Sequence, residues 1–239
     1  MALFVEVNFM IKLDARLSAV ASLVRVGKRV ADIGTDHAYL LSYLIEKGIC
    51  PNGIAADLRK GPLENARQTV IDAGLYDKVE LILSDGLENI KENSCDDIVL
   101  AGMGGNLIAE ILSKAQWIKN ENINIVAQPM THAEVLRQFF IDNGFEIIRE
   151  KTATDGRRLY CIMSAEYTGA VNEHDVSYIY TGRLLENNDE ITYEFVSKML
   201  STLVKKHSAL MAAGKSDEEN LGVVIDEIRC NMEKVKWLK

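Results

Sequence analysis

The feature that most constrains the fold is a regular alternation of short apolar runs and helical segments between residues 30 and 149. Each apolar run has the length of a strand that is buried on both faces. We expect strands at 30–34, 53–58, 79–83, 97–100, 123–127 and 145–149, and helices at 37–47, 62–74, 107–117 and 132–143. Strands that alternate with helices predict a parallel, doubly wound α/β sheet.

The pattern is extended at both ends. Apolar residues at helical spacing over 13–24 predict an amphipathic helix that packs on the sheet ahead of the first strand. A further apolar run at 159–164 predicts a seventh strand, and residues 150–158 leave no room for a helix before it. The last two strands should therefore form a hairpin, which places an antiparallel strand in the sheet.

From about residue 167 the pattern becomes helical. In the last run Leu221, Ile225, Ile228, Met232 and Val235 follow one another at spacings of 4, 3, 4 and 3, which is a heptad seam. A turn around residue 214 separates this run from the helical run before it, so the sequence predicts an antiparallel, coiled-coil-like helical hairpin. The hairpin is either a capping or dimerising element or an arm that binds substrate. We expect an N-terminal extension (1–10), a catalytic domain (11–167) and an all-α hairpin domain (168–239).

Composition excludes several classes of protein. A hydrophobic content of 48% and a charged content of 26% are typical of a globular protein, and no apolar run approaches the ~20 residues that span a bilayer. The net charge of -8 argues against indiscriminate nucleic-acid binding but permits a local basic patch. The four cysteines are far apart and form no C-x-x-C pair, so we expect no metal centre and a reducing, cytoplasmic location.

The first strand leads into a loop that should bind a cofactor. Residues 30–41 read V-A-D-I-G-T-D-H-A-Y-L-L, a strand, a tight turn at Gly34 and the start of a helix. A nicotinamide loop needs further glycines to grip a pyrophosphate, but Asp36 stands where the second would be. A carboxylate there would repel a pyrophosphate and would suit S-adenosylmethionine, which is cationic and has no phosphate. The alternative is that Asp36 only caps the helix.

The ends of the other strands carry further residues that could bind an adenosyl cofactor or its target base. Asp57 lies 23 positions after Gly34, near the offset at which an acidic residue binds ribose hydroxyls. Asp85 and Gly86 end the third strand, where a carboxylate can accept the adenine amino group. The glycine-rich run 101–105 follows the fourth strand and should give the target base a wall with few side chains, unless it is only a tight turn. Gln128 and Pro129, after the fifth strand, offer an amide to a base edge or simply end the strand.

These motifs carry a resemblance to a known family. L-D-A-R-L (13–17), D-I-G-T-D-H-A-Y-L, A-G-M-G-G, Q-P-x-x-H and D-G-R-x-x-Y (155–160) resemble the bacterial tRNA (adenine-22-N1)-methyltransferases. The likeness runs from about residue 11 to residue 167, and the hairpin is similar in kind to that family's C-terminal domain. Thr35 and Leu41 depart from the usual Ser and Pro. The resemblance implies a Rossmann-like, seven-stranded methyltransferase sheet.

The resemblance also implies a reaction: transfer of a methyl group from S-adenosylmethionine to N1 of adenine 22 in the D-arm region of tRNA. We expect no membrane partner and a monomer or weak dimer. The alternatives are a methyltransferase of a protein or small molecule and a non-catalytic adenosyl-binding partner of RNA. A nicotinamide oxidoreductase is disfavoured by Asp36.

The expected catalytic residues share the first loop: Asp36 to hold the amino group and the developing charge, His37 to position it or to contact a phosphate, and Tyr39 to stack on the base. The alternative is that Asp36 and His37 only shape the cofactor pocket. The expected cofactor contacts are Asp32, Gly34, Asp36, His37, Asp57, Leu58, Asp85, Gly86, Ala101, Gly102 and Met103. The expected substrate contacts are Gly104, Gly105, Gln128, Pro129, Arg157 and Tyr160. Exposed basic residues form a collective set of RNA contacts: Arg16, Arg59, Lys60, Arg157, Arg158, Lys198, Lys205, Lys206 and His207.

Overall fold

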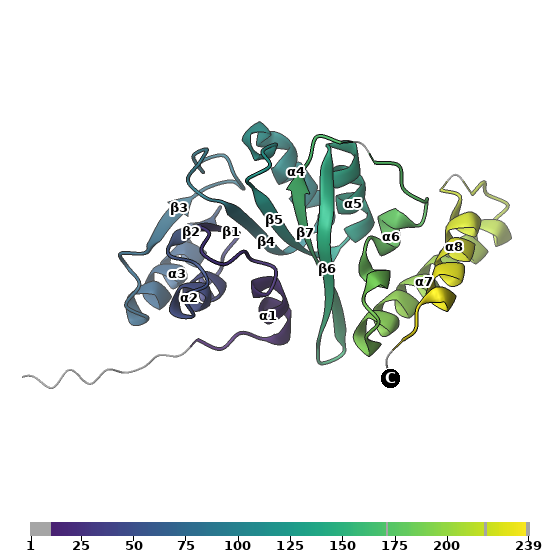
Figure 1. Cartoon of the computed structure of the whole chain (residues 1–239), viewed down its shortest axis with the longest axis horizontal. Helices are drawn as coiled ribbons and strands as arrows, with labels where there is room; N and C mark the ends of the chain where they lie inside the picture. Colours follow the sequence, from purple (N-terminus) through teal and green to yellow (C-terminus); the bar gives the residue numbers. More distant parts are fainter. Residues whose placement is uncertain (1–10, 171, 218, 238–239) are drawn as a thin grey trace, which may run out of the picture.

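A seven-stranded sheet with the strand order β3-β2-β1-β4-β5-β7-β6 runs through the molecule (Figure 1). The structure, a computed structural model, describes residues 11–170, 172–217 and 219–237, so the expected extension (1–10) lies outside the described residues. β1 to β5 pair in parallel, whereas β7 is antiparallel to both β5 and β6. This confirms the predicted Rossmann-like, doubly wound α/β methyltransferase sheet. The strands are β1 (Val30–Ile33), β2 (Gly53–Asp57), β3 (Val79–Leu83), β4 (Asp97–Gly104), β5 (Asn124–Thr131), β6 (Phe145–Asp155) and β7 (Arg158–Tyr167).

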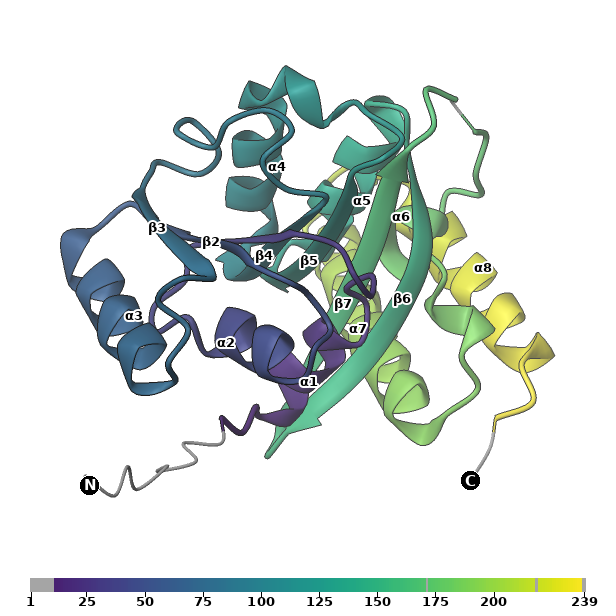
Figure 2. The ribbon, with the colours of Figure 1, turned by 60° about the vertical axis from the view of Figure 1, so that its left-hand side comes forward.

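Helices cover both faces of the sheet, and Figure 2 shows α4 and α5 on one side and α1, α2 and α3 on the other. Successive strand residues point to opposite faces, so Val30 of β1 packs with α1, α2 and α3 while the next residue, Ala31, packs with α4 and α5. This explains why the strands read as continuous apolar runs. The helices are α1 (Ala15–Ala21), α2 (Tyr39–Glu46), α3 (Lys60–Asp72), α4 (Gly105–Lys114), α5 (Ala133–Asp142), α6 (Tyr178–Thr181), α7 (Glu190–Ala212) and α8 (Leu221–Lys234), with short 3-10 turns at Gln116–Ile118 and Leu184–Glu186.

β4 and β5 are longer than the sequence suggested. The glycine-rich run was expected to be a loop, yet β4 continues to Gly104 and pairs with β5, which continues past Pro129 to Thr131. The register shifts between Ala101 and Met103 and again between Met103 and Gly104. Glycines allow such a bulge, and Pro129, which has no N–H to donate, is tolerated where the pairing is irregular. The expected strand end at Pro129 was therefore wrong.

The connection between the last two strands is also strand rather than loop. β6 runs to Asp155 and β7 begins at Arg158, so only Gly156 and Arg157 form the turn. Gly156 has φ 60°, a conformation that glycine adopts without strain. The sequence correctly predicted a hairpin with an antiparallel strand but missed how far the pairing extends.

The C-terminal helices form the predicted antiparallel hairpin, and Gly214 (φ 63°) follows the end of α7. The seam is real: Leu221, Ile225 and Ile228 are buried. Side chains of α7 and α8 belong to the same apolar cluster as α4, α5 and one face of the sheet. The hairpin is therefore packed against the sheet beside β6 and β7 (Figure 1), and the boundary at 167/168 stays a prediction.

Candidate active site

The carboxyl ends of β1 to β4 meet along one edge of the sheet. Ile33 pairs with Ala56 on one side and with Leu100 on the other. The Gly34 amide donates to the Ala56 carbonyl at 2.8 Å, and the Ser84 amide donates to the Asp57 carbonyl at 2.9 Å. This pairing places the residues that follow the four strands side by side, in the order 84–86, 57–58, 34–37 and 101–105. The structure thus brings together the four motifs that lie far apart in the sequence.

The first loop is built on Gly34 and Thr35. Gly34 has φ 76°, and the Met103 side chain lies directly over it, in the space a Cβ would occupy. The Thr35 hydroxyl accepts a hydrogen bond from the Ala38 amide at 3.0 Å, and Ala38 is the N-cap of α2 with φ 51°. The alternative that Asp36 only caps this helix is wrong, because no side-chain cap bond is formed and the Asp36 side chain is 68% exposed.

The three expected catalytic residues lie together on the surface of this loop. His37 Nε2 is 3.5 Å from Asp36 Oδ2. The His37 and Tyr39 rings stack with centroids 5.0 Å apart and an angle of 7° between their planes. Tyr39 is 42% exposed, so the stack has a free edge toward solvent. A carboxylate and a flat aromatic surface are what an adenine needs for hydrogen bonding and stacking.

Two of the expected cofactor carboxylates are buried. Burial raises the pKa of Asp32 to about 6, although Thr35 and Arg16 act in the opposite direction. Asp57 is 7% exposed, and its Oδ1 accepts a hydrogen bond from the Arg59 amide at 2.8 Å. Asp85 and Leu58, by contrast, are exposed beside them. The sheet edge therefore carries both buried and exposed carboxylates, which could bind ammonium and ribose hydroxyl groups.

A polar network links the start of the chain to β4 and β5. Arg16 Nη1 donates to Gln128 Oε1 at 2.8 Å, and the Gly102 amide donates to the same oxygen at 3.2 Å. Gln128 Nε2 donates to the Pro129 carbonyl at 3.0 Å, and Gln128 is fully buried. The expectation that the Gln128 amide contacts a base edge is corrected: its hydrogen-bonding groups are used within the protein, where they fix Arg16 and Gly102.

Arg16 is half-buried, although the sequence grouped it with exposed basic residues as an RNA contact. Its guanidinium lies 6.0 Å from the centroid of the Tyr160 ring and lowers the pKa of the neighbouring Asp32. The L-D-A-R-L motif was the available signal. Tyr160 is buried beneath it, whereas Arg157 is exposed in the β6–β7 turn. Arg157 and Tyr160 are thus separated, one at the surface and one in the interior.

The glycines of the predicted base platform differ from one another. Gly102 and Gly104 have surface exposure, and a Cβ on Gly104 would only approach the Thr131 hydroxyl. Gly105 is buried, and a Cβ there would overlap the His132 carbonyl. Gly105 is therefore needed for packing between α4 and the end of β5, and the expectation that it contacts the base is corrected on this ground.

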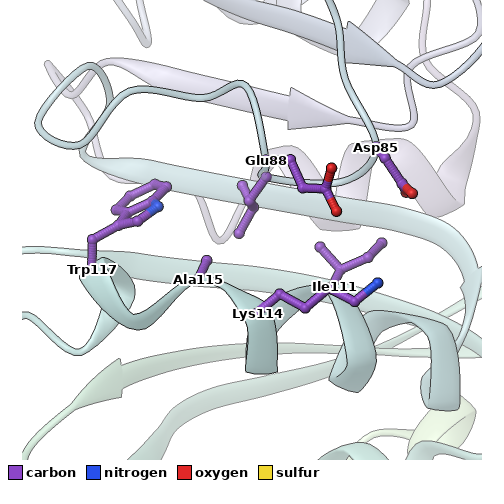
Figure 3. Close-up of a pocket in the computed structure, with 7 residues that line it drawn as sticks. Asp85, Glu88, Ile111, Lys114, Ala115 and Trp117 are labelled. Atoms are coloured by element: carbon purple, nitrogen blue, oxygen red, sulfur yellow. The ribbon is translucent and has the colours of Figure 1, made fainter.

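Two cavities border the site. A cavity of about 890 Å³ lies between the end of β5, the start of β7, α5 and α7; it includes Pro129 and Tyr160 in its wall. A smaller one of about 180 Å³ lies between α4 and the loop after β3 (Figure 3), and of the predicted site residues it includes only Asp85. Its volume is below the ~300 Å³ of ordinary ligand pockets. The open strand edge, rather than this cavity, therefore stays the predicted cofactor site.

In the described ranges, no group of three or more His, Cys, Asp or Glu side chains is arranged to hold a metal ion. No helix in the same ranges is long and apolar enough to cross a bilayer.

The comparisons with known proteins agree with this geometry. Residues 13–163 match a family described as "Methyltransferase domain". The chain is 33% identical over 168 residues to the tRNA (adenine(22)-N(1))-methyltransferase of Bacillus subtilis, covering 70% of this chain and 69% of that protein. The crystal structure of the B. subtilis M1A22 tRNA methyltransferase TrmK is similar with a TM-score of 0.75 at 27% identity, over 95% of this chain and 98% of that one.

A second similar structure has the cofactor product bound. It is TrmK of M. capricolum in complex with S-adenosyl-homocysteine, with a TM-score of 0.74 at 25% identity, covering 94% of this chain and 99% of that one. Sequence motifs, sheet order and both kinds of comparison lead to the same result. The chain belongs to the bacterial tRNA (adenine-22-N1)-methyltransferase family.

Proposed function

We propose that this protein transfers a methyl group from S-adenosylmethionine to N1 of adenine 22 in tRNA. The observation that carries the proposal is the strand edge of β1 to β4, where a glycine loop and several carboxylates converge in a chain of this family. Family membership and the acidic first loop favour methyl transfer over nicotinamide chemistry. Similar proteins are named for this activity or contain the cofactor product.

The residues present fit S-adenosylmethionine. Gly34 lets the Met103 side chain pack directly over the loop backbone, and Asp32 and Asp57 offer carboxylates to cationic and hydroxyl groups. Asp85, in the loop after β3, would hold the adenine end, with Leu58 and His37 beside it. Gly86 is buried against Ile111 and would contribute only its backbone. When bound, the cofactor supplies a methyl group on a positively charged sulfur.

The protein's part in the chemistry is chiefly to position and to stabilise charge. Adenine N1 has a lone pair, so in-line attack needs no general base, only alignment. N1 gains the methyl group and a positive charge, and the bonding electrons stay with sulfur. Asp36 is exposed on the loop, and its Oδ2 lies 3.5 Å from His37 Nε2. Its carboxylate accepts a hydrogen bond from the adenine amino group and stabilises the positive charge on the base. Tyr39 and its stacked partner His37 provide the flat surface for the base.

The target base must leave its helix, because N1 is occupied in a Watson–Crick pair. The cavity of about 890 Å³ borders the site at Pro129 and Tyr160 and extends to α7. We assign the tRNA strand that carries the extruded base to this side of the molecule, where the base would lie against Gly102 and Gly104. On the hairpin, Lys198 and Lys205 are exposed, whereas Lys206 is paired with Glu219 and His207 lies 3.5 Å from Asp217. Lys198 and Lys205 are therefore the cations that can contact tRNA phosphates.

Labelled cofactor and unmodified tRNA test the proposal. Tritiated S-adenosylmethionine is incubated with a tRNA transcript, which is then digested and analysed by mass spectrometry. The expected product is N1-methyladenosine, and it should disappear when adenine 22 is replaced by guanine. Cofactor binding without transfer would instead favour a protein or small-molecule methyltransferase or a non-catalytic partner. Sedimentation of the same sample measures whether the protein is the predicted monomer or weak dimer.

A further inference from the structure

A buried ion pair joins the catalytic sheet to the segment that leads into the helical hairpin. Arg137 of α5 donates from Nε to Glu150 Oε1 of β6 at 3.0 Å, and Nη2 lies 2.9 Å from the same oxygen. The side chains of Arg137 and Glu150 are 1% and 0% exposed. Burying two charges is unfavourable unless their remaining hydrogen-bonding groups also find partners. Those partners show what the pair does.

The other partners come from one short stretch of backbone. Arg137 Nη1 donates to the carbonyls of Ile179 and Tyr180, at 3.1 and 2.8 Å. Glu150 Oε2 accepts a hydrogen bond from the Arg183 amide at 2.6 Å. The pair is thus enclosed by residues 179–183, which contain the end of α6 and precede α7 by a few residues. We call Arg137, Glu150 and residues 179–183 the clamp.

Gly182 shows that this arrangement is specific. It has φ 48°, and a Cβ at this position would overlap Glu150 Oε2. Only glycine lets the backbone pass so close to the carboxylate. Two further contacts continue the attachment toward α7: Asn187 Nδ2 donates to the Glu150 carbonyl at 3.0 Å, and the hydroxyls of Thr152 and Thr192 are 2.8 Å apart.

A bulge in β6 brings Glu150 to the correct face. The register shifts between Ile147 and Arg149, so Ile147 pairs with Ala165 and Glu150 pairs with Met163. Ile147, Met163 and Ala165 all belong to the apolar cluster that includes α5 and α7. Without the extra residue the alternation of the strand would turn Glu150 to the opposite face, where α1 packs. The bulge therefore serves the clamp.

The clamp also lines the cavity of about 890 Å³ that we assign to the tRNA strand. Arg137, Ile179 and Tyr180 form part of its wall on the sheet side, and Phe195 and Met199 of α7 form part of the facing wall. The distance between these walls depends on where residues 179–183 are held. Fixing this segment fixes α7 relative to the catalytic edge.

We infer that Arg137 and Glu150 are positioning residues that hold the helical hairpin at the distance from the catalytic edge that tRNA binding requires. This inference rests on the proposed function, because it assigns the hairpin to tRNA. Neither residue touches the cofactor side of the sheet edge. The clamp should therefore affect the KM for tRNA much more than kcat or the affinity for cofactor.

The test replaces both charges together, so that no unpaired charge is left buried. In Arg137→Met/Glu150→Leu we expect the KM for tRNA to rise at least tenfold, with kcat at saturating tRNA within threefold and the cofactor Kd within twofold of the parent. A matched control is Arg25→Met/Asp97→Leu, which removes an ion pair of 2.7 Å between the segment after α1 and β4, away from the hairpin. A folded clamp variant with an unchanged KM, or a control that raises it equally, overturns the inference.

A conservative variant covers the case in which the double variant does not fold. Arg137→Lys keeps the charge but loses the planar fork that reaches Glu150 and both carbonyls. We expect it to raise the KM for tRNA to an intermediate value, again without a change in cofactor Kd. An unchanged KM in this folded variant contradicts the clamp.

A distance measurement separates failure of the clamp from failure of the proposed function. Cys230 on α8 is exposed, whereas Cys50, Cys95 and Cys161 are buried, so Cys230 and an introduced Ser18→Cys on α1 can be spin-labelled selectively. The distance distribution should be narrow in the parent and broader in the double variant or in Arg137→Lys. Broadening in a protein that makes no N1-methyladenosine supports the clamp while rejecting the function. Equal widths reject the clamp, whatever the activity.

Discussion

Arg16 Nη1 and Gln128 Oε1 are joined by a hydrogen bond of 2.8 Å across 112 positions of the sequence. The same Gln128 oxygen accepts from the Gly102 amide, so α1, β4 and β5 meet at one atom. The guanidinium also lowers the pKa of the buried Asp32 carboxyl. The contact therefore connects the shape of the glycine-rich run to the charge state of Asp32 in β1.

Replacing Arg16 should affect both the Asp32 carboxyl and the glycine-rich run. In Arg16→Met we expect the pKa of Asp32 to rise further above about 6, because a cation that stabilises its charged form is lost. Turnover should fall about tenfold as the Gly102 backbone loses its support. Carboxyl NMR titration measures the first effect and steady-state kinetics the second. Arg59→Met, next to Asp57 rather than Asp32, is the control; an equal rise of the Asp32 pKa in both variants would contradict the assignment.

Asp32 should destabilise the cofactor-free protein at neutral pH. Its folded pKa of about 6 lies above the ordinary 3.8, so stability falls as the pH rises from about 4 to about 6, and the loss is complete above that range. Asp32→Asn should therefore raise the free energy of unfolding at pH 7.5 by up to about 3 kcal/mol. The gain should shrink toward pH 4. Urea unfolding at several pH values measures it.

The same substitution should weaken cofactor binding, because the carboxylate is lost from the strand edge. A variant that is less stable than the parent at pH 7.5, or equally stabilised at pH 4, would show that burial of the Asp32 charge is not the cause. The comparison needs the cofactor-free protein, since a bound cation would favour the charged carboxylate.

Gly34 should be intolerant of a side chain for two separable reasons. Gly34→Ala places a methyl group at φ 76° and displaces Met103, so we expect a loss of about 3 kcal/mol in unfolding free energy and loss of cofactor binding. Gly48→Ala is the matched control, because Gly48 has φ 66° but nothing within 4 Å of a Cβ. It should lose only about 1 kcal/mol. Equal losses of unfolding free energy in the two variants would mean that Met103 can move aside without destabilising the protein.

Asp36 should act on the reaction far more strongly than on cofactor binding. Asp36→Asn keeps the shape of the side chain but removes the charge that faces the methylated base, so kcat should fall about 100-fold. The cofactor Kd should stay within twofold. Single-turnover kinetics and calorimetry measure these quantities. Most of the turnover surviving in the variant would assign Asp36 to the shape of the loop alone.

Lys198 and Lys205 should contribute to tRNA affinity. Reversing both charges (Lys198→Glu/Lys205→Glu) should raise the KM for tRNA about tenfold and weaken its dependence on salt, since fewer counterions are released. Lys28→Glu/Lys78→Glu, with the same change in net charge before β1 and β3, is the control. An equal rise in the KM for tRNA in both double variants would mean that only the net charge of the protein matters, and not the position of these lysines. Charge reversal is preferable to deleting the hairpin, which would expose the shared core around Val196 and Leu203.

The sequence by itself determined the layers of the fold and the chemistry of the first loop. Apolar runs such as 30–33 are buried on both faces and must be interior strands, and the helices between them leave a parallel sheet as the solution. In such a sheet the strand ends share one edge, so Gly34, Asp57 and Asp85 could be brought together without a structure. These inferences use only neighbours in the sequence and the rules of strand connection.

Tertiary structure alone decided which polar groups face the ligand and which serve the protein. Gln128 and Gly105 looked available from the sequence, but Gln128 is fully buried beside Arg16, and Gly105 packs against the His132 carbonyl. The Arg137–Glu150 pair depends on a bulge that shifts β6 by one residue, which no periodicity in the sequence announces. Burial and hydrogen bonding between distant segments depend on packing in three dimensions, and a local pattern does not contain that information.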